Sequence, residues 1–174
     1  EVRVEHFSVG DIDSDGKDEI IWANNGPTNP AYGTTSTAHA AYSGDRFIIA
    51  SVSGDIGVLP QLVEEYAVSP RDADKDGVRE NKFGGGSPQG VVIADTDGDG
   101  KKEAWCFSWN NLSTFSIEAT GPDAYTVSDT GYKFAARDEW TLSPAVADVD
   151  KDGKDEVYVS GWYTGIVYAI ADKD

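Results

Sequence analysis

One nine-residue acidic motif occurs four times in this chain of 174 residues. It reads Asp-x-Asp-x-Asp-Gly-x-x-Glu, and its copies begin at Asp11, Asp72, Asp95 and Asp148. Because the chain contains 21 Asp, 19 Gly and 10 Glu, a shuffled sequence would hold only about 0.002 copies. Chance does not explain the motif, so the fold must accommodate four tight acidic loops.

The spacing of the motif favours calcium. Alternate carboxylates at positions 1, 3 and 5 turn inward together, and the Gly at position 6 permits a sharp turn. Position 7 offers a backbone carbonyl, and the carboxylate at position 9 closes the shell. The predicted carboxylate ligands are Asp11, Asp13, Asp15 and Glu19; Asp72, Asp74, Asp76 and Glu80; Asp95, Asp97, Asp99 and Glu103; and Asp148, Asp150, Asp152 and Glu156.

Other readings of the motif fit less well. Zinc and copper prefer His and Cys, and the chain offers only His6, His39 and Cys106, none at a ligand spacing beside a loop. Magnesium usually keeps several waters, which an all-protein cage excludes. Asp and Gly are also ordinary hairpin residues, but a turn alone does not require the same Glu four times.

An EF-hand is excluded by the residue at position 12, where that loop needs an acid. The four copies carry Trp22, Phe83, Cys106 and Val159 there. The first, third and fourth copies are followed by short apolar runs typical of β-strands. In such a run Cys106 is expected to be a buried residue rather than a nucleophile.

The third and fourth copies align over a longer stretch, at an offset of 53 residues, which indicates an internal repeat. The predicted strands are 4–9, 19–23, 37–43 and 46–53 in the first unit, and 90–94, 103–108, 112–118 and 124–128 in the second. Only 60–66 offers a candidate helix. Four short strands per period near 50 residues are typical of propeller blades.

The predicted fold is therefore all-β, with about three four-stranded antiparallel blades of a β-propeller. Residues 1–57, 89–141 and 142–174 form blade-like units, the last one incomplete, and residues 58–88 form an insertion around the copy at Asp72. Three blades do not close a ring, because closed propellers have four to eight. We expect the rest of a larger propeller, or another protein chain, to complete it.

The motifs that begin at Asp11, Asp95 and Asp148 resemble those of FG-GAP/VCBS repeats, which build the propellers of integrin α-chains and many secreted bacterial proteins. This resemblance places calcium in the turn between the first two strands of each blade. It assigns backbone carbonyl ligands to Lys17, Lys101 and Lys154, and Val78 holds the same place in the remaining copy. Here Glu stands at position 9, where Asp is commoner in the family.

The net charge of −17 argues against nucleic acid and anionic membranes as partners. Sixteen of the 31 acidic residues lie in the four motifs, so the charge belongs mainly to the predicted metal sites. No apolar run is long enough to span a membrane. A start at Glu1 suggests a mature chain or a piece of a longer one. Sites of the extracellular calcium class indicate a secreted, surface-bound or periplasmic location.

Two classes of function follow from these features. The first is a non-catalytic module that binds a protein or a glycan, with Trp109 and Trp162 at equivalent places as a candidate ligand face. Packing between blades is the alternative role for both Trp side chains. The second class is a fragment of a polysaccharide-active enzyme, because calcium-binding propellers also occur in rhamnogalacturonan lyases. His6, His39 or a Lys would then act as the base.

Overall fold

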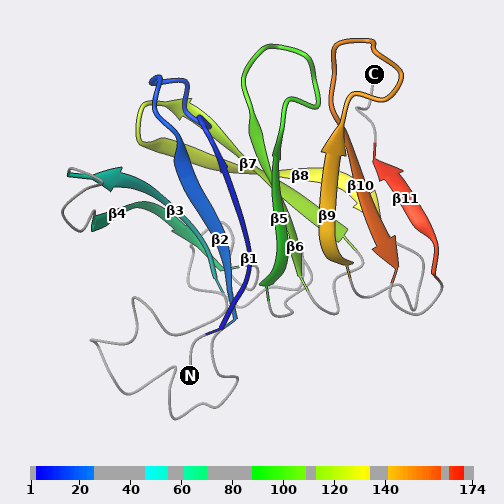
Figure 1. Cartoon of the computed structure of the whole chain (residues 1–174), viewed down its shortest axis with the longest axis horizontal. Coiled ribbons are helices and arrows are strands. Elements are labelled where there is room, and N and C mark those ends of the chain that lie inside the picture. The colour runs from blue at the N-terminus through cyan, green and yellow to red at the C-terminus, as the bar shows by residue number, and fades with distance from the viewer. Residues whose placement is uncertain are drawn as a thin grey trace.

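The chain folds into three antiparallel β-sheets (Figure 1). A computed structural model describes residues 3–25, 46–54, 61–69, 88–108, 113–133, 141–161 and 165–170, and none of these is helical. The strands are β1 (Arg3–Gly10), β2 (Glu19–Asn25), β3 (Arg46–Ser53), β4 (Gln61–Val68), β5 (Pro88–Ala94), β6 (Glu103–Ser108), β7 (Ser113–Gly121), β8 (Ala124–Lys133), β9 (Thr141–Ala147), β10 (Glu156–Gly161) and β11 (Val167–Ile170). The all-β prediction is confirmed for this part of the chain.

Each sheet is a meander, in which every strand pairs with the strand that follows it in sequence. The first sheet has the order β1-β2-β3-β4, the second β5-β6-β7-β8, and the third contains β9, β10 and β11. An acidic motif connects the first two strands of every sheet. The predicted strands of the second unit are confirmed, each within a few residues of its observed bounds.

The first sheet differs from the prediction in its outer strands. Residues 46–53 were expected as the fourth strand and form the third, while the fourth is β4, inside the range predicted as an insertion. The candidate helix at 60–66 is wrong for residues 61–66, which belong to strand β4. A register shift between Ile49 and Ala50 in the β3–β4 pairing breaks the alternation that marks a strand. The predicted strand 37–43 lies outside the described residues.

The three sheets stack face to face, with the second sheet in the middle. Side chains of β5 and β6 alternate, so that Val91 and Cys106 pack against the first sheet, whereas Val92 and Trp105 pack against the third. All six residues of β6 are buried. Across the first interface Phe47 meets the edge of Phe115, with ring centroids 5.4 Å apart. Two apolar layers therefore hold the sheets together.

The first strands of the three sheets lie side by side through the middle of the molecule (Figure 1). His6 on β1 is hydrogen-bonded through Nδ1 to the carbonyl oxygen of Val91 on β5, at 3.0 Å. Gly10 faces Ile93, and a β-carbon at Gly10 would lie 3.4 Å from that side chain. This close approach of β1, β5 and β9 sets the three acidic loops next to one another.

Candidate metal-binding loops

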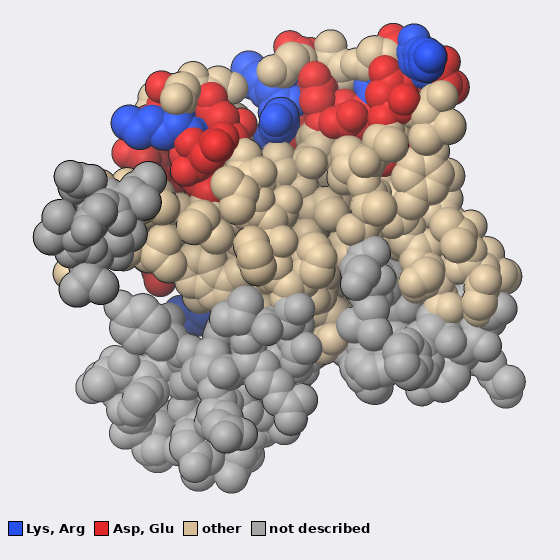
Figure 2. Space-filling model, in the orientation of Figure 1, with Lys and Arg blue, Asp and Glu red and all other residues tan. Residues whose placement is uncertain are grey.

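Three of the four acidic motifs lie along one edge of the molecule. Loop 1 (residues 11–18), loop 2 (95–102) and loop 3 (148–155) follow β1, β5 and β9, respectively. Figure 2 shows acidic side chains gathered along this edge, with basic side chains between them and mostly uncharged surface below. The fold therefore concentrates much of the negative charge of the chain at the ends of three neighbouring strands.

The three loops share one scheme of hydrogen bonds. In each, the first Asp accepts from the backbone N–H of the Gly at position 6, with N···O distances of 3.1, 3.0 and 3.1 Å. The second Asp accepts from the N–H of the third, and the third Asp accepts from the N–H of the Lys at position 7, at 2.7 to 3.1 Å. These bonds wrap the backbone around the carboxylates.

The backbone conformation of the loops explains the invariant Gly at position 6. Gly16, Gly100 and Gly153 have φ angles of 89°, 86° and 95°, in the left-handed region that other residues rarely adopt. Position 4 also has a positive φ in every loop, and there the chain uses Ser14, Gly98 and Lys151. Two left-handed residues within three positions reverse the chain tightly enough to bring alternate side chains to one side.

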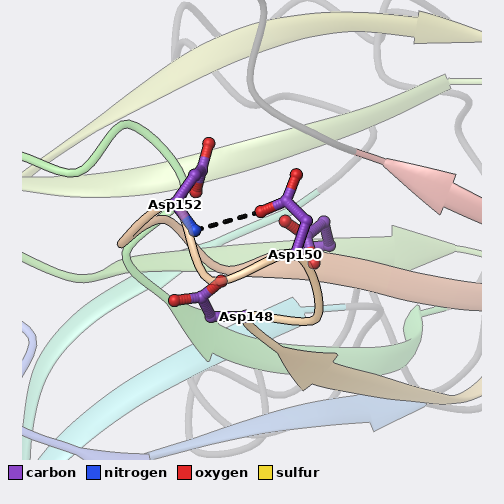
Figure 3. A group of neighbouring side chains, drawn as sticks. Asp148, Asp150 and Asp152 are labelled. Atoms are coloured by element: carbon purple, nitrogen blue, oxygen red, sulfur yellow. Dashed lines mark hydrogen bonds between the residues drawn. The ribbon is translucent and has the colours of Figure 1, made fainter.

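The loops bring their carboxylates close together. In loop 3, one oxygen from each of Asp148, Asp150, Asp152 and Glu156 lies within 4.8 Å of all the others. Figure 3 shows the three Asp side chains of this loop and the hydrogen bond from the Asp152 N–H to Asp150. The three Asp residues of loop 1 and of loop 2 form groups of the same kind. Oxygens at such spacing suit a hard cation.

The Glu at position 9 lies beneath each loop. Its Oε2 accepts a hydrogen bond from the backbone N–H of position 2, at 2.8 Å in loops 1 and 3 and 3.1 Å in loop 2. Glu19 and Glu103 are buried, and they stand outside the close Asp groups of their loops, whereas Glu156 joins its group. Burial of the carboxyl group raises the pKa of Glu19 and of Glu103 to about 7, and the neighbouring Asp charges add to this effect.

Lysine side chains partly neutralise the loops. Lys17 Nζ lies 2.6 Å from Asp15 Oδ2, and Lys101 Nζ lies 3.8 Å from Asp99 Oδ2. The hydrogen bond from Lys17 lowers the pKa of Asp15. Both pairs are exposed to solvent, where water and salt screen them, so they hold the carboxylates only weakly. A divalent cation competes well with such a partner.

Neighbouring loops and sheets are also tied to one another. The backbone N–H of Asp95 in loop 2 donates to Asp155 Oδ2 in loop 3 at 3.0 Å, and the N–H of Asp155 donates to the Asp95 carbonyl at 2.8 Å. In loop 1, Asp13 Oδ2 accepts from the N–H of Asp123 in the β7–β8 turn, at 2.7 Å. Each of loops 1, 2 and 3 therefore contacts an adjacent sheet.

Sequence reasoning missed the residues that make these links. Asp155 stands at position 8, where the motif does not specify a residue, and Asp123 comes from a distant turn. Asp13 also forms a second carboxylate group with Glu65 and Asp123. Tyr125 donates to Glu65 Oε2 at 2.7 Å, so this group is bound into the β4–β8 contact. A local sequence pattern does not predict contacts between residues that are 60 to 110 positions apart.

Several predicted residues lie outside the described part of the chain. These are Trp109, Trp162, His39 and the whole motif formed by Asp72, Asp74, Asp76, Val78 and Glu80. Cys106 is fully buried, and burial raises the pKa of its thiol well above the ordinary value, as expected for a packing residue. One of the two ring nitrogens of His6, Nδ1, is hydrogen-bonded to the carbonyl oxygen of Val91.

No protein-family model matches the chain, and no curated protein matches it in sequence. The likeness to FG-GAP/VCBS repeats rests on the loop motifs alone. Within the described residues, no helix is long and apolar enough to cross a membrane.

Proposed function

We propose that this chain is a calcium-binding module whose metal ions hold its β-sheets together. The observation that carries the proposal is the close grouping of carboxylate oxygens in loops 1, 2 and 3, within 4.8 Å in each group. The same hydrogen-bond scheme in all three loops supports it, because ordinary turns do not need the side-chain arrangement to recur. Oxygen ligands without nitrogen or sulfur favour calcium over zinc or copper.

Calcium acts here as a clamp. Without a cation, three or four carboxylates in one loop repel one another, and a bound divalent ion turns this repulsion into attraction. Each loop joins the first two strands of a sheet, so the ion fixes that hairpin. The hydrogen bonds between Asp95 and Asp155 pass the effect from loop 2 to loop 3.

The overall architecture proposed for the chain is part of a β-propeller. Face-to-face stacking of the sheets and the inner position of β1, β5 and β9 are in keeping with blades around an axis. The proposed role is binding or assembly with a protein or a glycan rather than catalysis. Extracellular modules of this calcium class work at millimolar calcium, which favours a secreted, surface-bound or periplasmic site of action.

Thermal unfolding in calcium and in chelator tests this proposal. A site filled about thirtyfold above its dissociation constant adds about 2 kcal/mol to the free energy of unfolding. We therefore expect a large rise in melting temperature with calcium, and a smaller one with magnesium. The double variant Asp150→Asn/Asp152→Asn should lose part of the calcium response, whereas Glu64→Gln, an exposed residue of β4, should keep it. Identical melting curves in calcium and chelator would refute the proposal.

A further inference from the structure

Loops 2 and 3 are joined by a closed pair of hydrogen bonds. The backbone N–H of Asp95 donates to Asp155 Oδ2 at 3.0 Å, and the backbone N–H of Asp155 donates to the carbonyl oxygen of Asp95 at 2.8 Å. Because both bonds connect the same two residues, a shift of either backbone stretches them. Position 8 of loop 3 therefore holds the first residue of loop 2 in place.

A side chain of loop 3 also packs closely on loop 2. A β-carbon at Gly98 would lie 3.0 Å from Lys154 Cγ, closer than β-carbons ordinarily approach a side chain. Position 4 has a positive φ in all three loops, yet loop 1 carries Ser14 there and loop 3 carries Lys151. The backbone conformation therefore does not by itself require glycine at this position. We attribute Gly98 to the close approach of Lys154.

Within the described residues, loop 1 has no link of this kind to loop 2. Position 8 of loop 2 is Lys102, whose ammonium group only donates hydrogen bonds and cannot accept the N–H of Asp11. Position 8 of loop 1 is Asp18, which is exposed and makes no side-chain hydrogen bond to the part of the chain that the structure describes. By contrast, Lys154 and Asp155 of loop 3 are half-buried.

The link lies next to the proposed ligands of both loops. Asp155 stands between Lys154, which offers its backbone carbonyl, and Glu156, whose carboxylate joins the group of loop 3. A cation in loop 3 therefore fixes the backbone on both sides of Asp155. Asp95 is the first carboxylate of loop 2, and its two oxygens accept backbone N–H groups of that loop at 2.8 and 3.0 Å. A fixed Asp155 thus positions the residue around which loop 2 folds.

We infer that loops 2 and 3 bind calcium cooperatively, as a pair, and that loop 1 binds its ion independently of them. This inference rests on the proposed function, since it treats the loops as calcium sites. An ion in loop 3 orders Asp155 and, through it, Asp95, so the next ion meets a site that is already partly ordered. Coupling between binding sites is reciprocal, so an ion in loop 2 favours loop 3 by the same factor, which we expect to be about tenfold.

Repulsion between the two ions does not cancel this coupling. From Asp148 to Glu156 the chain has five carboxylates and two lysines, so this segment keeps a net negative charge after it binds one Ca²⁺. The first ion therefore reduces the attraction of loop 2 for a cation but does not replace it with repulsion. Salt screens this longer-range effect within about 8 Å, whereas the hydrogen bonds between Asp95 and Asp155 are direct contacts.

A calcium titration followed by NMR of the ¹⁵N-labelled chain tests the inference loop by loop. Gly16, Gly100 and Gly153 each donate a backbone N–H to the first Asp of their own loop, so each of these resonances shifts when that loop binds its ion. The double variant Asp150→Asn/Asp152→Asn removes two proposed ligands of loop 3. In this variant the dissociation constant measured at Gly100 should rise about tenfold, and that measured at Gly16 should not change.

Substitutions of Asp155 separate the link from the effect of charge. In an Asp155→Ala background, the same double variant of loop 3 should no longer alter the dissociation constant of loop 2, although the change in charge is the same. Asp155→Asn keeps a side-chain carbonyl oxygen for the Asp95 N–H, so the tenfold effect should remain. The matched control Asp18→Ala, at position 8 of loop 1, should also leave this effect intact.

Two results would overturn the inference. One is a dissociation constant of loop 2 that does not depend on whether loop 3 can bind calcium, and the other is a coupling of full size in the Asp155→Ala background. If the three glycine resonances all shift with calcium but titrate independently, the coupling is refuted and the calcium sites stand. If none of them responds to millimolar calcium, the proposed function fails as well, so the two failures are distinguishable.

Discussion

The substitution Glu103→Gln should stabilise the metal-free protein and weaken its response to calcium. Glu103 is 8% exposed, and its Oε2 accepts hydrogen bonds from the backbone N–H and the hydroxyl of Thr96, both at 3.1 Å. Burial raises the pKa of this carboxyl from 4.5 to about 7. A neutral amide of the same shape retains an acceptor for Thr96 and has no charge to bury.

The magnitude and the sign follow from the two pKa values. Below pH 4.5 the carboxyl is neutral in both the folded and the unfolded chain. Between pH 4.5 and about 7 only the unfolded chain ionises, so the stability of the wild type falls as pH rises. The whole interval corresponds to about 3 kcal/mol, because each pH unit is worth about 1.4 kcal/mol. Above pH 7, Glu103→Gln should gain up to this amount.

Urea unfolding in calcium-free buffer at about pH 4 and about pH 8 measures this difference. We expect nearly equal stabilities at the lower pH and a more stable variant at the higher pH. In calcium the order should reverse, because the variant lacks one carboxylate of loop 2. Glu118→Gln, in β7 of the same sheet, serves as the control and should change neither value. A variant less stable than the wild type at pH 8 without calcium would refute the burial argument.

Two further substitutions probe the loops. Gly100→Ala should lower the free energy of unfolding by about 1 kcal/mol and weaken calcium binding, because Gly100 has a φ of 86°. In denaturant unfolding, the control Gly121→Ala should stay within about 0.5 kcal/mol of the wild type, since a β-carbon there meets no atom within 4 Å. Asp155→Ala removes the carboxylate that accepts a hydrogen bond from the Asp95 N–H. Calorimetric titration should then show weaker calcium binding at loop 2, although every residue of loop 2 is unchanged. Unaltered titration curves would contradict that link.

Strands with alternating apolar residues and loops with the acidic motif were predictable from the sequence. Residues 103–108 alternate between two apolar faces and follow an acidic motif, so the strand and its place after the loop were clear. Strand β4 does not show the alternating pattern of a strand in its sequence. Its pairing with β3 has a register shift at Ile49 and Ala50, and Glu64 and Glu65 stand next to each other in it. An irregular pairing leaves no period in the sequence, and the outer strand of the first sheet was therefore missed.

The contacts between sheets were not predictable in the same way. Nothing near Asp155 indicates that its carboxylate binds the backbone of Asp95, sixty positions earlier. Glu19 and Glu103 are buried under their loops, and the acidic motif alone does not indicate this burial. By contrast, the three Asp residues of each loop are fixed by spacing alone, because the turn at the Gly brings alternate side chains together.

Counting the bound metal tests the central claim most directly. Equilibrium dialysis against millimolar calcium, followed by elemental analysis of the protein, gives the number of ions per chain. We expect four ions, three in loops 1, 2 and 3 and one in the motif that begins at Asp72, and one fewer in the double variant Asp150→Asn/Asp152→Asn. A chain that retains no calcium at millimolar concentration would contradict the account.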